Sequence, residues 1–206
     1  MITIYGRGRG FRVVRLLEEM GLPYRLRDVD MRAGVENDAE FLRINPAGFI
    51  PALVDGSATM VESIAIMEYL MARYGPTPLS PEPTSTAYPA YQQFLHLGEA
   101  GMAAAVFFAG NARRLPTEAE RSNPTARHAL RQYENRLTLV RRQLDRTPYL
   151  AGEAFTAADI SVAYAIDLAE RFADVAPGAE EAAHLARVRT RDAYARAVAA
   201  CAKAAP

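Results

Sequence analysis

The segment from Asn45 to Ser63 constrains the fold more than any other part of the chain. Pro51 stands where a strand opens, one of the few positions in a sheet that tolerate proline. Asp55-Gly56 then predicts a hairpin turn, and Ser63 stands where an apolar helical repeat begins. We therefore expect strands over residues 51–54 and 59–61, followed by a helix over residues 63–74.

A strand–helix–strand unit is expected ahead of this segment. The run Ile2–Tyr5 is β-branched and aromatic, as strands are. Residues 13–20 repeat apolar side chains at helical spacing, and residues 24–30 alternate as a second strand. Two strands joined by a helix in this order form a βαβ unit, which predicts a parallel strand pair with a right-handed crossover. A short helix is also expected over residues 38–43.

Proline marks the boundary between two domains. Residues 75–86 contain four prolines, which exclude a helix and favour an extended linker. We expect a first domain over residues 1–75, a linker over 76–86 and a helical second domain over 87–206. A long helix with a narrow buried seam is predicted by spacings of three and four between Leu130, Tyr133, Leu137, Val140 and Leu144.

Composition limits the classes of function. The chain has 206 residues, half of them apolar, with 24 basic and 24 acidic side chains. This favours a globular protein and gives no charge excess for nucleic acid. No stretch is long and apolar enough to span a membrane, and the first residues do not resemble a signal peptide. Cys201 is the single cysteine, so no internal disulfide forms. We therefore expect the protein to be located in a reducing compartment, the cytoplasm.

Two features of the central segment suit a bound peptide. A proline at position 51 can be cis, which turns the backbone of Ile50 outward to pair with an extended chain. The hydroxyl of Ser63, the helix amides and the helix dipole favour a carboxylate. A plain hairpin followed by a satisfied helix cap is the alternative interpretation.

The combined motif resembles the glutathione transferase family over nearly the whole chain. It reads Asn-Pro-x-Gly-x-Ile-Pro-x-Leu from Asn45, then Glu-Ser-x-Ala-Ile from Glu62. The resemblance implies an α/β thioredoxin-like N-terminal domain, an all-α C-terminal domain and a homodimer. It implies glutathione as co-substrate, a small hydrophobic electrophile as its partner, and a role in detoxification.

The resemblance also assigns roles to residues of the motif. The resemblance implies that Ile50, beside Pro51, binds the cysteinyl backbone of glutathione. It also implies that Glu62 and Ser63 bind the γ-glutamyl end. Phe49 stands where relatives commonly carry Lys, Arg or Gln against the glycine end. A phenylalanine cannot donate that hydrogen bond, so either glutathione binds more weakly, or an arginine elsewhere compensates, or Phe49 packs into a dimer interface.

The group that stabilises the cofactor thiolate is the open question. A free thiol has a pKa near 8.5, and only the thiolate is a good nucleophile. Residues 6–12 contain no Ser, Thr or Cys, and Tyr5 is the one hydroxyl nearby. Tyr5 is thus a candidate donor, with Arg7, Arg9 or backbone amides as alternatives. We expect Arg12 to form an interdomain salt bridge.

The second half of the chain gives a folding signal and a weaker site prediction. Thr156 and Asp159 form a capping box, so Asp159 is not expected to be catalytic. The candidates for the electrophile pocket are Phe107, Phe108, Asn111 and Tyr164. Aromatic residues at helical spacing are more often part of a core. The three histidines lack ligand spacing, so no metal is expected.

Other functional classes remain open. A dinucleotide fingerprint fails because Phe11 occupies its third glycine position. A protein of the same fold that binds glutathione or apolar ligands, or docks onto other proteins, without catalysis is the main rival to a transferase. A glutathione-dependent peroxidase or isomerase is a third possibility.

Overall fold

The computed structural model describes residues 1–31 and 33–202, and the chain divides into two compact units. The first comprises Met1–Thr77 together with the segment from Arg191 onward, and the second comprises Pro78–Thr190. The division after Thr77 lies within the expected linker. The segment from Arg191, by contrast, was assigned to the second domain from the sequence and is grouped here with the first unit.

A four-stranded mixed sheet forms the centre of the first unit. Its order is β2-β1-β3-β4, and its strands are β1 (Ile2–Tyr5), β2 (Tyr24–Arg27), β3 (Ala52–Asp55) and β4 (Ala58–Val61). β1 runs parallel to β2, whereas β3 runs antiparallel to β1 and to β4. The predicted parallel pair and hairpin are confirmed. β2 is shorter than predicted, because the chain turns after Arg27 and the Asp28 carboxylate accepts a hydrogen bond from the Val29 amide.

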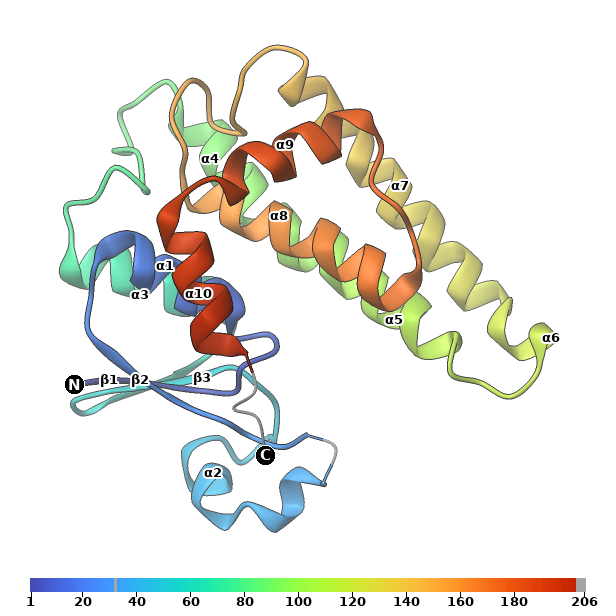
Figure 1. The fold of residues 1–206 in the computed structure, drawn as a ribbon, viewed down its shortest axis with the longest axis horizontal. Coiled ribbons are helices and arrows are strands. Elements are labelled where there is room, and N and C mark those ends of the chain that lie inside the picture. Colours follow the sequence, from blue (N-terminus) through green and yellow to red (C-terminus); the bar gives the residue numbers. More distant parts are fainter. Residues whose placement is uncertain (32, 203–206) are drawn as a thin grey trace. The chain divides into compact units, whose positions relative to one another are not determined.

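Helices cover both faces of this sheet. They are α1 (Phe11–Met20), the single 3₁₀ turn η1 (Val35–Asn37), α2 (Ala39–Ile44), α3 (Ser63–Tyr74) and α10 (Asp192–Cys201). Figure 1 shows α1 and α3 on one face of the sheet, α2 on the other, and α10 beside α1. Of the apolar residues expected at the core of α1, Val13, Leu16 and Leu17 are fully buried, whereas Met20 is half-buried. Gly21 ends α1 in a left-handed conformation, which glycine adopts without strain.

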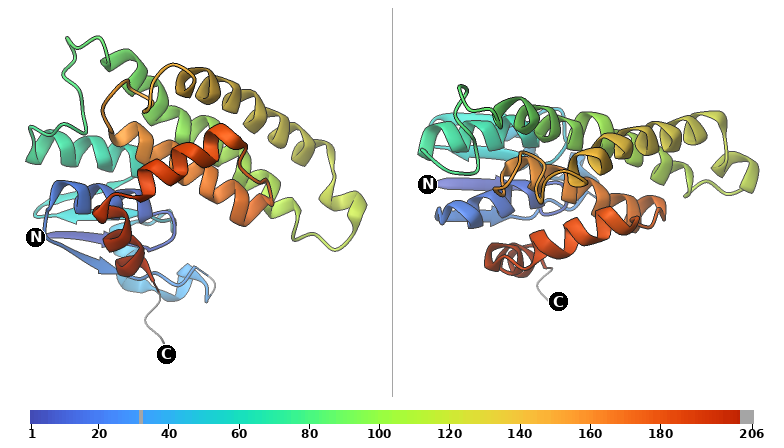
Figure 2. Two further views of the ribbon diagram at one scale, coloured as in Figure 1. Left: turned by 45° about the horizontal axis from the view of Figure 1, so that its top comes forward. Right: turned by 90° about the horizontal axis from the view of Figure 1, so that it is seen from above.

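The second unit consists of helices joined by loops, with one isolated β-bridge between Tyr149 and Gly152 in its described residues. Its elements are α4 (Tyr88–His96), η2 (Leu97–Ala103), α5 (Ala104–Ala112), α6 (Glu118–Arg121), α7 (Pro124–Leu144), α8 (Ala157–Leu168), η3 (Ala169–Ala173) and α9 (Ala179–Arg189). Figure 2 shows the long helix α7 alongside α5. Tyr133, Leu137 and Val140 are buried along the predicted seam of α7, while Leu130 and Leu144 are half-buried. The mixed first unit and the helical second unit confirm the predicted fold class.

Helix α8 is the core of the second unit. Nearly all of its residues are buried, and Ser161 donates a hydrogen bond of 2.7 Å to the carbonyl of Leu95. A Cβ at Gly98 would lie 2.3 Å from the Ser161 hydroxyl oxygen, so η2 and α8 can approach this closely only with glycine there. The predicted capping box is confirmed, because Asp159 accepts hydrogen bonds from the Thr156 amide and hydroxyl. In the described part of the chain, no helix combines the length and apolarity needed to cross a membrane.

Candidate functional site

The bend before β3 presents a short stretch of backbone. The Ile50-Pro51 peptide bond is cis, as the sequence allowed. Asn45 is buried, and its side-chain amide donates a hydrogen bond of 2.6 Å to the carbonyl of Phe49. The backbone groups of Ile50 take no hydrogen bond within residues 1–31 and 33–202. Ile50 therefore carries a donor and an acceptor that an extended peptide can use.

The glycine-rich loop after β1 packs directly against this bend. Gly6 has a φ of +90°, and a Cβ there would lie 2.4 Å from the Ile50 side chain. A Cβ on Gly10 would lie 2.0 Å from the Gly6 carbonyl oxygen. At Gly8 the nearest atom is 3.8 Å away, which is ordinary contact. Gly6 thus allows close packing of the loop against Ile50, and Gly10 allows close packing within the loop itself.

The start of α3 provides the second half of the site. Ser63 is 4% exposed, and its hydroxyl oxygen accepts a hydrogen bond of 2.9 Å from Nη1 of Arg12. Arg12 lies in α1 and is fully buried. Because Arg12 uses the oxygen of Ser63 as acceptor, the hydroxyl proton of Ser63 remains available to a ligand. A guanidinium and a hydroxyl donor are therefore paired at this helix N-terminus.

Backbone conformation and electrostatics favour an anion at the same place. Glu62 has a φ of 69°, in the left-handed region that side chains other than glycine rarely occupy. Such conformations tend to be retained at binding and catalytic sites. No side chain caps the amides of α3, and no acidic residue lies in its first turn. The helix dipole and these amides add to the positive charge of Arg12.

Tyr5 is part of the core of the first unit. It is 8% exposed and belongs to a cluster with Val29, Phe41 and Ala52, against which Ile50 also packs. Its ring centroid lies 6.0 Å from that of Phe41, and the guanidinium of Arg27 lies 5.5 Å from the ring centre. Tyr5 is thus near Ile50, with its ring engaged in packing.

The two candidate arginines lie in the glycine-rich loop. Arg7 donates a hydrogen bond to the carbonyl of Ala202, at the end of α10, and its Nε lies 3.6 Å from the Asp28 carboxylate. Arg9 is half-buried in the same loop. Helix α1 begins after Gly10 with no side-chain cap and no acidic residue in its first turn. The backbone amides at the start of α1 are therefore uncapped, and they lie beside the glycine-rich loop whose residues were considered as partners of the glutathione thiolate.

The pocket candidates of the second unit fall into two groups. Phe107, Phe108 and Asn111 are exposed on α5, whereas Tyr164 is 5% exposed within α8. Phe107 stacks on Phe172 with ring centroids 5.8 Å apart. Helix α5 therefore offers an exposed aromatic face, and Tyr164 belongs to the buried interior.

Metal-binding clusters and reactive thiols are two further kinds of site that can carry chemistry. The described residues contain no group of three or more His, Cys, Asp or Glu side chains that could hold a metal ion. Cys201 is half-buried, and burial raises the pKa of its thiol to about 11, so it is mainly protonated at neutral pH.

The sequence did not predict the positioning roles of two residues, Arg12 and Asn45. The hydrogen bond from Arg12 to Ser63, within the first unit, was not expected, and the interdomain salt bridge of Arg12 stays a prediction. Asn45 was recognised only as part of the motif, whereas it fixes the carbonyl before the bend. The signal for Asn45 was its place ahead of two prolines and a glycine. No local signal could have paired Arg12 with a residue 51 positions away.

Comparison with known protein families gives two matches. The model described as "Glutathione S-transferase, N-terminal domain" matches residues 2–72. The model described as "Glutathione S-transferase, C-terminal domain" matches residues 65–192. Together the two models cover residues 2–192.

Individual relatives agree with these matches. The chain is 29% identical to glutathione S-transferase 3 of Schizosaccharomyces pombe, over 79% of this chain and 71% of the relative. It is 32% identical to glutathione S-transferase 3 of Zea mays, over 72% and 68%. Its structure resembles that of the theta class glutathione S-transferase from Xanthomonas axonopodis pv. citri, solved with glutathione bound. That similarity has a TM-score of 0.79 at 29% identity and covers 96% of each chain.

Proposed function

The chain belongs to the glutathione S-transferase family, and from this premise we propose that it conjugates the thiolate of glutathione to small hydrophobic electrophiles. In this reaction the sulfur forms a bond to an electrophilic carbon, and the leaving group departs with the bonding electrons. With a chloronitroarene the leaving group is chloride. The thiol proton goes to solvent before the attack.

The observation that carries this proposal is the pairing of the Ile50 backbone with the donors at Ser63. Ile50 offers unpaired backbone groups for the cysteinyl residue of glutathione. Ser63, buried beside Arg12, offers a hydroxyl proton and positive charge for the γ-glutamyl carboxylate. To Glu62, which is exposed and in a left-handed conformation, we assign acceptance of a hydrogen bond from the γ-glutamyl ammonium. Phe49 leaves the glycine end without a side-chain donor at that position.

We assign stabilisation of the thiolate chiefly to the amides at the start of α1. They lack a side-chain cap, and the helix dipole favours negative charge there. The alternatives have less to support them. The ring of Tyr5 is packed into the core, and Arg7 is engaged by Ala202 and Asp28. Arg9 remains a secondary candidate on the same loop.

The pKa of the bound thiol separates these assignments. Absorbance of the thiolate is titrated against pH for glutathione on the wild type, on Tyr5→Phe and on the exposed control Tyr74→Phe. If α1 amides dominate, the bound thiol titrates at least about one unit below 8.5 in all three proteins. A return to about 8.5 in Tyr5→Phe alone would assign the role to Tyr5.

Turnover separates a transferase from a binding protein. The rate of conjugation to a chlorodinitrobenzene is measured at saturating glutathione, beside a panel of organic peroxides and isomerisable substrates. We expect saturable conjugation. Thermal stabilisation by glutathione without turnover on any substrate would instead support the non-catalytic binder, and the buried position of Tyr5 is the observation that favours that alternative.

Membership of the family also leads to proposals for the electrophile site and for the assembly of the protein. We propose that Phe107, Phe108 and Asn111 on α5 contact the apolar electrophile, and that Tyr164, buried in α8, acts only through the packing of the second unit. The exposure of both phenylalanines, 42% and 61%, supports an apolar contact surface.

We further propose a homodimer and a cytoplasmic location. Light scattering during size-exclusion chromatography measures the mass of the assembly, and a monomer at micromolar concentration contradicts the dimer.

A further inference from the structure

Helix α10 contacts both ends of the segment that leads from the glycine-rich loop into α1. Nη1 of Arg7 donates a hydrogen bond of 2.5 Å to the carbonyl of Ala202, which caps the end of α10. The ring of Phe11, the first residue of α1, lies edge-on to the ring of Tyr194, with centroids 6.0 Å apart. All four residues belong to the first unit. Helix α10 therefore contacts the loop and the residue at which the thiolate-binding amides begin.

Ion pairs hold α10 on α1. Arg191 donates to both carboxylate oxygens of Glu19 at distances between 2.7 and 3.0 Å. Arg196 donates to the Glu18 carboxylate at 2.7 Å and to the Glu18 carbonyl at 2.9 Å. These contacts fix α10 on α1, so its contacts with the loop and with the start of α1 can hold those parts in place.

The glycine-rich loop, residues 6–10, needs such an anchor. Three of its five residues are glycine, which loses more conformational freedom on ordering than any other residue. The backbone holds the first of them, because the Gly6 amide donates to the Arg27 carbonyl at 2.8 Å. Beyond Gly6, the bond from Arg7 to α10 ties the loop to a regular element.

Two negative groups meet the charge of Arg7. Its Nε lies 3.6 Å from the Asp28 carboxylate, and the carbonyl end of α10 carries the negative end of the helix dipole. These partners offset the charge of the guanidinium. Arg7 is therefore better suited to hold the loop than to stabilise a thiolate by its own charge.

We propose that α10 positions the thiolate-binding amides of α1, with Arg7 and Tyr194 as positioning residues. The inference rests on the proposed function, because it concerns the same thiolate. Hydrogen-bond donors stabilise an anion best when they are fixed in the direction of its charge. Loss of either contact lets the loop and the start of α1 adopt other conformations, so the amides face the sulfur for less of the time.

Titration of the bound glutathione thiol by absorbance tests this on the wild type, Arg7→Gln, Tyr194→Ala and the double variant. Each single variant should raise the pKa of the thiol by at least about half a unit, which lowers the thiolate fraction about threefold. The double variant should raise it by less than the sum, because both residues act through α10. Affinity for S-hexylglutathione, which has no free thiol, should stay within about twofold, because Ile50 and Ser63 are unchanged.

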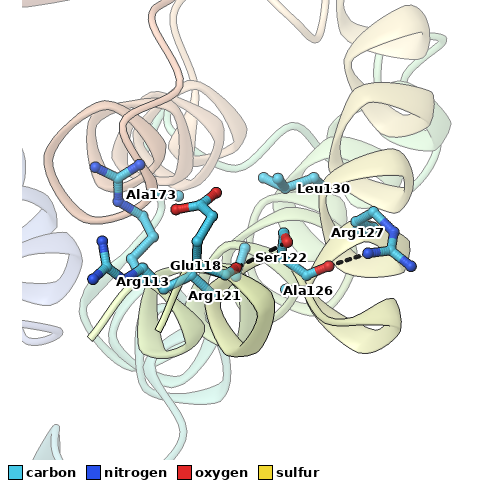
Figure 3. Close-up of a pocket in the computed structure, with 9 residues that line it drawn as sticks. Arg113, Glu118, Arg121, Ser122, Ala126, Arg127, Leu130 and Ala173 are labelled. Atoms are coloured by element: carbon cyan, nitrogen blue, oxygen red, sulfur yellow. Dashed lines mark hydrogen bonds between the residues drawn. The ribbon is translucent and has the colours of Figure 1, made fainter. Parts of the chain in front are cut away.

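Arg127→Gln is the matched control. Arg127 of α7 also donates to the carbonyl of a helix-capping residue, Ser122 at the end of α6, beside a cavity of the second unit (Figure 3). The substitution removes the same kind of hydrogen bond from the other unit. It should leave the pKa of the bound thiol unchanged.

Circular dichroism checks that each variant is folded, and Tyr194→Leu replaces Tyr194→Ala if the latter is not. The inference is overturned if the pKa of the thiol stays at the wild-type value in the folded variants, or if the double variant shows the full sum. A rise in Arg7→Gln alone would also overturn it, by assigning Arg7 a direct electrostatic role. A wild type that neither binds nor conjugates glutathione would instead overturn the proposed function, and this inference with it.

Discussion

At the scale of single residues, the site depends on contacts that allow little variation. Arg12 is fully buried, so its charge needs a polar partner, and the Ser63 hydroxyl is one of those it finds. Gly6 and Gly10 leave no room for a Cβ, because the Ile50 side chain and the Gly6 carbonyl fill that space. The same residues that pack the first unit therefore define the shape of the proposed glutathione site.

Arg12→Met should weaken glutathione binding. The shorter, uncharged side chain loses the charge and the hydrogen bond to Ser63, and charge-assisted hydrogen bonds contribute about 1.5–3 kcal/mol. We expect the dissociation constant to rise at least about tenfold. Calorimetry on Arg12→Met, Ser63→Ala and the double variant measures the coupling. Strictly additive losses would show that the two residues act separately.

Gly10→Ala should destabilise the first unit, whereas Gly8→Ala should not. The added methyl at position 10 would lie 2.0 Å from a backbone oxygen, but at position 8 it meets nothing closer than 3.8 Å. Overpacking of this kind costs about 1–3 kcal/mol. Urea denaturation measures both variants, with Gly8→Ala expected within about 0.5 kcal/mol of wild type. Equal losses at the two positions would contradict the close packing described here.

At the scale of elements, α8 and α9 bring two buried ionisable groups together. Nε2 of His184 lies 3.7 Å from the Asp159 carboxylate, and both side chains are fully buried. Burial raises the pKa of Asp159 to about 6, although the Leu150 and Thr156 amides donate hydrogen bonds to it. Burial, with a smaller contribution from Arg187, lowers the pKa of His184 to about 4.

These two shifts should have opposite effects on stability between pH 4 and pH 6. A carboxyl whose pKa is raised in the folded state stabilises at low pH, and this is lost as pH rises through about 6. A histidine whose pKa is lowered stabilises at high pH, and this is lost as pH falls from 6.5 towards about 4. Each shift of about two units corresponds to about 3 kcal/mol, so the two largely cancel in the wild type.

Variants separate the two groups. Relative to wild type, His184→Gln should lose stability as pH rises from 4 to 6, because Asp159 then acts alone. Asp159→Asn should gain stability over the same interval, because His184 then acts alone. Urea denaturation of the three proteins at several pH values provides the slopes. The same slope in all three would contradict the shifts.

Elements with a local signal were predictable from the sequence. The capping box at Thr156 and Asp159 and the start of α3 at Ser63 are set by neighbouring residues, and both were predicted where they occur. Contacts between distant residues were not. The hydrogen bond from Arg12 to Ser63 depends on how α1 and α3 pack on the sheet, and the burial of Tyr5 depends on α2.

At the scale of the whole molecule, two helices far apart in the sequence, α1 and α10, pack against each other. Helix α10 packs beside α1, and Tyr194 lies edge-on to Phe11 with ring centroids 6.0 Å apart. Glu19 of α1 accepts hydrogen bonds from Arg15 and from Arg191, which is 172 positions away. No local pattern predicts such a pairing, which explains why the sequence placed this segment in the second domain.

Glu19→Gln should destabilise the first unit much more than the matched Glu18→Gln. The Glu19 side chain is 4% exposed between two arginines, whereas Glu18 pairs with Arg196, whose side chain is 54% exposed. Breaking a buried ion pair costs about 3–5 kcal/mol, and an exposed pair contributes at most about 1 kcal/mol. Urea denaturation measures both. Similar losses would show that Glu19 does not hold α10 in place.

The central claim is that glutathione lies with its backbone on Ile50 and its γ-glutamyl carboxylate at Ser63. Titration calorimetry with reduced glutathione, on the wild type, on Ser63→Ala and on the hairpin control Ser57→Ala, tests it most directly. We expect binding to wild type and to Ser57→Ala with equal affinity, and at least about tenfold weaker binding to Ser63→Ala. No heat of binding to wild type at millimolar glutathione, or full affinity in Ser63→Ala, would contradict it.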